Sequence, residues 1–160
     1  MRLTSDQCWA NLSAVDHGVL CTNGARGAID AVPICFVVLG KVVASPIDTV
    51  KAKDTTELGR LRNLEGDATA TLVCEQWVRH DWSRLWWVKA QLTRRSGHDV
   101  TTKLRENCEE ELRRKYFQYR GSEFADLLVF DVKSVSGWAA SEDPDAARHA
   151  MIGDGARTDY

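Results

Sequence analysis

The residues best suited to chemistry in this sequence are three tryptophans and two cations between positions 82 and 89. The rings belong to Trp82, Trp86 and Trp87, and the charges to Arg84 and Lys89. Aromatic faces beside a fixed positive charge suit a flat, conjugated, anionic ligand. The same pattern also fits a strand that Trp86 and Trp87 straddle, with one ring in the core and the other at an interface, and the segment alone leaves both interpretations open.

A second candidate group is a cluster of cations that follows an apolar segment. Its members are Lys51, Lys53, Arg60 and Arg62, and Thr49 and Thr55 lie on the same stretch. Lysine, threonine and arginine side chains in a loop at the end of a strand are suited to binding a phosphate tail. A solvated loop and helix face would have the same composition, so this cluster also has two interpretations.

Familiar catalytic motifs are missing from the sequence. It contains no G-x-G-x-x-G, no Walker loop and no G-x-S-x-G. The four histidines are scattered without metal-ligand spacing, so we expect no metal site. Cys35 lies in an apolar segment and is better explained as a core thiol than as a nucleophile. Such a sequence fits either a binding module or an enzyme whose cofactor carries the chemistry.

Composition narrows the class of protein. The chain has 160 residues, 44% of them hydrophobic, which is enough for one domain with a substantial core. A net charge of -2 argues against a protein that binds nucleic acid through phosphate contacts. Five cysteines without a C-x-x-C pair are typical of reduced thiols in the cytoplasm. The N-terminus lacks the apolar stretch of a signal peptide, and the apolar run 31–44 is too short and too interrupted to span a membrane.

The candidate residues must be positioned by short strands and a few helices. Hydrophobic patterning predicts strands at 19–22, 29–39, 41–45, 70–78, 85–92 and 127–132, with helices at 4–15, 56–64 and 101–116. Tight turns between the first three strands indicate an antiparallel meander, and Pro46 is expected to end the third. Pro33, inside the second strand, indicates an edge, a bulge or a place where a ligand meets the backbone. The charged residues of 101–116 are expected to form a solvated helix face.

These elements predict a mainly β fold, a small barrel of six antiparallel strands with peripheral helices. We expect residues 1–140 to form this one domain. Residues 141–160 have no apolar period, so a flexible C-terminal tail is expected there.

Five short motifs add a family resemblance that spans most of the chain. They are V-P-I-C-F at 32–36, K-x-K-x-T at 51–55, R-L-R-N at 60–63, D-W-S-R-L-W-W-V at 81–88 and G-W at 137–138. Together they resemble the PPOX-class F420-dependent enzymes, which belong to the pyridoxamine 5'-phosphate oxidase-like split β-barrels that bind FMN or F420. The string at 81–88 is the most specific of the five. One departure is Leu92, which stands where the family usually has a glycine, so the ring pocket or the bend of this strand is expected to differ from the family's.

The resemblance implies a homodimer that binds a flavin or deazaflavin at its interface. It implies that a strand lies along the ring, that a cation-rich loop holds the phosphate and anionic tail, and that tryptophans line the ring site, some of them from the partner subunit. The strand residues are Val32, Pro33, Ile34 and Cys35; the tail residues are Ser45, Thr49, Lys51, Lys53, Thr55, Arg60, Arg62 and Asn63; the tryptophans are Trp86, Trp87 and Trp138.

The sequence therefore predicts a cytoplasmic F420-dependent reductase that transfers a hydride between the deazaflavin and a small conjugated acceptor. FMN is the alternative cofactor. The rival interpretations are a non-catalytic carrier or sensor of a flavin, a deazaflavin or haem, and an FMN-dependent oxidase. No residue is assigned as catalytic, although Arg84 is a candidate for polarising an acceptor carbonyl. A salt bridge from Arg84 to Asp81 or to another neighbour is the structural alternative.

Overall fold

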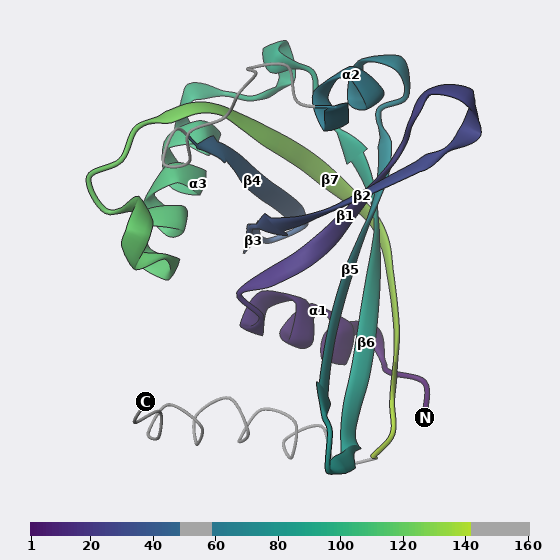
Figure 1. Ribbon diagram of the computed structural model, residues 1–160. Helices are drawn as coiled ribbons and strands as arrows, with labels where there is room; N and C mark the ends of the chain where they lie inside the picture. The colour runs from purple at the N-terminus through teal and green to yellow at the C-terminus, as the bar shows by residue number, and fades with distance from the viewer. Residues whose placement is uncertain (49–58, 142–160) are drawn as a thin grey trace, which may run out of the picture.

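The computed structural model describes residues 1–48 and 59–141. Within them, three α-helices surround a sheet of seven antiparallel strands (Figure 1). The helices are α1 (Ser5–Ala14), α2 (Gly59–Gly66) and α3 (Thr102–Lys115). The strands are β1 (His17–Asn23), β2 (Ile29–Cys35), β3 (Val37–Leu39), β4 (Val42–Asp48), β5 (Thr69–Val78), β6 (Asp81–Arg94) and β7 (Phe124–Ala139). Short 3-10 helices are η1 (Ala25–Gly27), η2 (Gly97–Asp99) and η3 (Phe117–Tyr119).

The sheet has seven strands rather than the predicted six, because the segment predicted as one strand over 29–39 forms two. The interruption is at Phe36. Its backbone N–H donates to the Tyr116 hydroxyl at 2.9 Å, and its carbonyl accepts from Lys115 Nζ at 3.0 Å. Because side chains satisfy both backbone groups, Phe36 leaves the strand ladder without an unpaired polar group.

The two antiparallel pairings of the predicted meander are present, but as separate pairs, β1 with β2 and β3 with β4, because the break at Phe36 places β2 and β3 at opposite edges of the sheet. The strand order is β2-β1-β5-β6-β7-β4-β3, so β1 and β2 pair as expected, and β4 pairs with β7 as well as with β3. The sheet curls so that β2 and β3 are its two edges (Figure 1). The edge position of β2 explains why Pro33 is tolerated there, since an edge strand need not donate on both sides.

The later strands are longer than hydrophobic patterning predicts. β6 begins at Asp81 and β7 runs to Ala139, and their pairing continues through polar residues such as Lys89 opposite Ser136. Pro46 does not end β4 but pairs with Leu127. The partner strand β3 reaches only as far as Ala44, so β4 is paired on one side beyond that point and can accommodate a proline.

The core lies on both faces of the curled sheet. Inside the curl, α1 packs beside strand residues that include Leu20, Leu72, Trp86, Leu128 and Phe130. Close packing of α1 depends on Gly137, because a Cβ there would lie 2.8 Å from the Trp87 carbonyl oxygen and 2.9 Å from a methyl of Leu3. The outer face of β3, β4 and the start of β7 is covered by α3 and η3, whose buried residues are Cys108, Leu112 and Tyr119.

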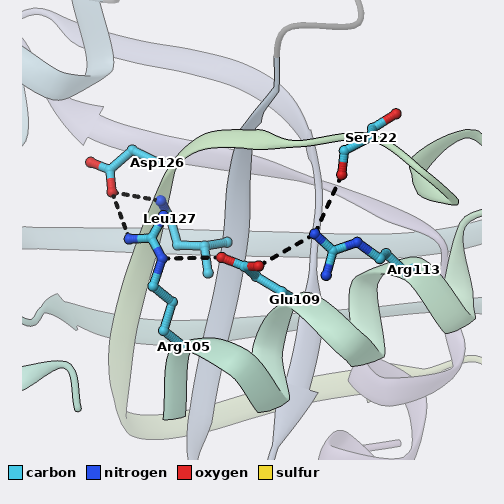
Figure 2. Close-up of polar contacts among 6 residues, drawn as sticks. All are labelled: Arg105, Glu109, Arg113, Ser122, Asp126 and Leu127. Atoms are coloured by element: carbon cyan, nitrogen blue, oxygen red, sulfur yellow. Dashed lines mark hydrogen bonds and ion pairs between the residues drawn. The ribbon is translucent and has the colours of Figure 1, made fainter. Parts of the chain in front are cut away.

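Charged residues of α3 fasten the helix to β7 instead of forming only a solvated face. Glu109 accepts from Arg105 Nε at 3.0 Å and from Arg113 Nη2 at 3.3 Å (Figure 2). Arg105 also reaches Asp126 at 3.4 Å, and Arg113 donates to the Ser122 carbonyl at 3.3 Å. These contacts fix the end of α3, which lines the cavity described below. No helix in the described residues is long and apolar enough to cross a membrane.

Candidate functional site

A cavity of about 770 Å³ lies where the α1–β1 junction, β2, β4, α2 and the end of α3 meet. It is lined by Asp16, His17, Pro33, Ile34, Cys35, Ser45, Pro46, Arg60, Lys115, Tyr116, Phe117, Gln118 and Tyr119. Pockets of this size are typical of small-molecule and cofactor sites. The lining combines apolar side chains with a few cations and polar groups.

The cavity brings together five of the residues that sequence analysis singled out: Pro33, Ile34, Cys35, Ser45 and Arg60. They come from β2, β4 and α2. Ser45 is almost fully buried, and Cys35 is half-buried. Val32, the remaining strand residue, is half-buried and packs against the core. Four predicted residues, Thr49, Lys51, Lys53 and Thr55, lie outside the described residues.

Arg62 and Asn63 line a second cavity, of about 540 Å³, together with Asp30 and Asp67. The Asn63 carboxamide donates to Asp30 at 2.5 Å and to Thr22 at 3.0 Å, which ties α2 to β1 and β2. Hydrogen bonds from the backbone of Thr69 and from Asn23 lower the pKa of the Asp67 carboxyl. The second cavity therefore holds carboxylates as well as a cation.

The predicted tryptophans lie outside the larger cavity. Trp86 is 1% exposed, and its Nε1 donates to the Gln76 side chain at 3.0 Å. Trp87 and Trp138 are opposite each other in the β6–β7 pairing, and Lys89 Nζ lies 5.1 Å from the centroid of the Trp87 ring. A role of these rings from a partner subunit stays a prediction.

Arg84, the tentative catalytic residue, is half-buried in β6 and does not line the cavity. Its Nε is buried without a hydrogen-bond partner. No ion pair joins it to Asp81 within the described residues; the Asp81 carboxylate accepts from the Ser83 backbone at 3.2 Å instead. The salt bridge that was the structural alternative for Arg84 is thus not observed. The role of Arg84 in polarising an acceptor carbonyl stays a prediction.

Sequence analysis missed the wall formed by Asp16, His17 and the end of α3. Lys115 Nζ donates to the carbonyls of Val15 and Phe36 at 2.6 and 3.0 Å. Burial lowers the pKa of Lys115, and the nearby Asp16 opposes that shift. Burial has the opposite effect on the neighbouring Tyr116 hydroxyl and raises its pKa. No spacing in the sequence signals this wall, because it depends on a contact between residues as far apart as Phe36 and Tyr116.

No protein-family model matches the sequence, and no curated protein is similar to it. Solved structures do share its architecture. A FAD-binding protein from Mesorhizobium loti is 11% identical over 86% of this chain and 93% of its own, with a TM-score of 0.58. A candidate pyridoxamine 5'-phosphate oxidase from Corynebacterium glutamicum is 14% identical over 86% and 94%, with a TM-score of 0.54. The heme storage protein from Vibrio cholerae is 11% identical over 84% and 91%, with a TM-score of 0.55.

The chain has the split-barrel fold of these proteins. At such identities the similarity extends to the fold and not to the ligand. The expected mainly β split barrel is therefore confirmed in its class, with seven strands in place of six. The narrower resemblance to F420-dependent enzymes stays a prediction.

Proposed function

We propose that the larger cavity binds a flavin-type cofactor and that the protein is an oxidoreductase. The observation that carries this proposal is the convergence of Pro33, Ile34, Cys35, Ser45 and Arg60 on one cavity. Pro33, Ile34 and Cys35 come from one motif of the sequence and Arg60 from another, and the fold brings them together with Ser45. The similar structures of flavin-binding and oxidase-type split barrels support the same proposal.

The residues of the cavity fit such a cofactor. Pro33 and Ile34 offer an apolar surface for a flat ring, and β2 is an edge strand whose outward backbone groups pair with no other strand of the described residues. Those groups can hydrogen-bond the polar edge of the ring. Arg60 supplies a guanidinium, which suits a phosphate because it can donate two parallel hydrogen bonds.

The cofactor would supply the hydride chemistry. The chain's own residues bind it, orient its ring along β2 and keep water from the covered part of the ring. We expect the acceptor to be a small conjugated molecule. F420 is the cofactor that the sequence motifs favour, and FMN is the alternative.

Two arginines of α2 provide a test between these cofactors. Arg60 lines the larger cavity and Arg62 the second one. Arg60→Ala should weaken both FMN and F420 by about tenfold or more, because a charged hydrogen bond contributes about 1.5–3 kcal/mol. Arg62→Ala is the matched control for FMN, whose single phosphate needs one cation. It should weaken only F420, whose longer anionic tail would extend beyond Arg60.

Binding is measured by following cofactor and tryptophan fluorescence for each variant. Unchanged affinity of Arg60→Ala for both cofactors would contradict the proposal. If Arg62→Ala leaves F420 affinity unchanged while Arg60→Ala weakens FMN, the cofactor is FMN. Turnover is then followed with reduced cofactor and a panel of enones, quinones and nitro compounds.

A haem-binding carrier is the second candidate function. One observation favours it: the imidazole of His17, a common haem ligand, lines the same cavity. The heme storage protein among the similar structures gives independent support. Haemin is therefore included in the titration, with His17→Ala as the variant. Saturable haemin binding that requires His17, with no binding of either flavin, would favour the carrier over the oxidoreductase.

A further inference from the structure

One wall of the larger cavity comes from neither β2 nor α2, and the only role given to it so far is that of His17 in the alternative haem site. This wall is formed by Asp16 and His17, at the junction of α1 and β1, and by the segment from Lys115 to Tyr119. Figure 1 shows that α2 and the C-terminal end of α3 approach the strands from different directions. The cavity therefore receives one cation, Arg60, from α2 and another, Lys115, from α3.

Lys115 is a cation held in place without a carboxylate partner. Its Nζ donates to two carbonyl oxygens and lies 4.8 Å from the centroid of the Phe36 ring and 5.3 Å from that of Tyr116. No Asp or Glu of the described residues forms an ion pair with it. An ammonium group has three donors, so one remains for a ligand.

The surroundings of Lys115 are rigid. The Tyr116 hydroxyl accepts from the Phe36 N–H at 2.9 Å and lies 2.6 Å from the Asp16 carbonyl oxygen and 2.7 Å from that of Phe36. An ion pair from Arg105 of α3 to Asp126 of β7 holds the helix itself, and Arg105 also pairs with Glu109 within α3 (Figure 2). A partly buried positive charge in a fixed position is costly alone and favours an anion that can pair with it.

We propose that Lys115 forms a subsite for the carboxylate of a conjugated acceptor, beside the cofactor. This inference rests on the proposed function and names its substrate class. Asp16 lines the same wall, so the subsite suits a single negative charge better than a dianionic phosphate. Phe117, 72% exposed at this wall, offers an aromatic face to the conjugated part of the acceptor.

The test uses trans-cinnamate and its neutral amide, cinnamamide, as probes of matched shape. Calorimetric titration of the wild-type protein, with and without saturating FMN or F420, should show that cinnamate binds about tenfold more tightly than the amide or better. Lys115→Met, which keeps the length of the side chain, should abolish this preference without changing the affinity for FMN. Lys115→Arg should keep it.

Equal binding of the two probes to the wild type, or no cinnamate binding at millimolar concentration, would overturn the proposal. So would a preference that survives in Lys115→Met. If Lys115→Met weakens FMN but not riboflavin, the subsite holds the cofactor phosphate and the acceptor assignment falls. Should Lys115→Met fail to fold, the wild-type comparison and Lys115→Arg still decide. A cinnamate preference in a protein that binds no cofactor would leave the subsite standing and refute the proposed function.

Discussion

At the scale of single residues, the two adjacent tryptophans of β6 have different environments. Trp86 shares its face of the strand with the buried Val88 and Ala90, and Trp87 shares the other with Lys89. One interpretation of the sequence was that the two rings straddle a strand, with one of them in the core. The structure confirms that one ring is in the core and identifies it as Trp86. Any role of Trp87 in ring binding remains open to experiment.

Replacing Trp86 by alanine should lower the free energy of unfolding by about 3–5 kcal/mol, because a large buried ring leaves a cavity. The substitution also leaves the Gln76 side chain without its partner. Trp82→Ala is the matched control, since Trp82 is 67% exposed. Urea titration of both variants checks the difference, and equal losses in the two would contradict the assignment of Trp86 to the core.

The cavity residues illustrate what sequence alone can reach. Pro33, Ile34 and Cys35 could be selected because they are consecutive and form a motif. Lys115 and Tyr116 could not, since their place in the cavity depends on hydrogen bonds to Phe36, about eighty positions away. Long-range contacts of this kind leave no local spacing in the sequence.

At the scale of elements, the types of helix and strand were predictable, and the pairing was not. The three helices and most strand centres follow hydrophobic periodicity. The break at Phe36 and the pairing of β4 with β7 do not, because both depend on partners distant in sequence. The polar ends of β6 and β7 are strands because each continues the ladder of the other.

The contact between Arg95, just after β6, and Asp131 of β7 should make stability depend on pH. Arg95 Nε donates to Asp131 at 3.0 Å, and this hydrogen bond lowers the pKa of the Asp131 carboxyl from its ordinary 3.8. A lowered pKa favours the ionised carboxylate in the folded state. The stabilisation is therefore present above about pH 4 and is lost as the pH falls below it.

Asp131→Asn should be less stable than the wild type at pH 6, with a difference that shrinks as the pH falls towards 2. Both residues are partly exposed, so the effect should be modest. Glu123→Gln is the control, because Glu123 is exposed and forms no ion pair among the described residues. Thermal unfolding of the wild type and Asp131→Asn is followed across this pH range. A stability difference between the two proteins that stayed constant with pH would contradict this prediction.

At the scale of the whole molecule, the described helices cover only part of the outer face of the sheet, at β3, β4 and the start of β7. The face that carries Trp86 is packed with α1, whereas Trp87 and Trp138 lie opposite each other on the other face. Trp138 is 37% exposed. A half-buried ring, Trp87, opposite an exposed one, Trp138, on the outer sheet face fits a protein interface. We propose that this pair is buried in a homodimer, as the sequence resemblance implies.

Light scattering at micromolar concentration should give twice the chain mass of 17.9 kDa. Trp138→Glu should shift the protein towards the monomer, because a charge buried in an apolar interface is costly. Ile29→Glu, at a side chain 63% exposed at the start of β2, should leave the dimer intact. A wild-type monomer, or a dimer unaffected by Trp138→Glu, would refute this interface.

The central claim, a flavin-type cofactor in the cavity beside β2, is tested most directly by alkylation of Cys35. Cys35 and Cys21 are half-buried, but only Cys35 lines the cavity, and Cys8, Cys74 and Cys108 are buried. With FMN or F420 at about 100 times its Kd, iodoacetamide labelling of Cys35, read by peptide mass spectrometry, should slow about 100-fold. Labelling of Cys21 should not change. A protein that binds the cofactor while Cys35 reacts at its original rate would contradict the claim.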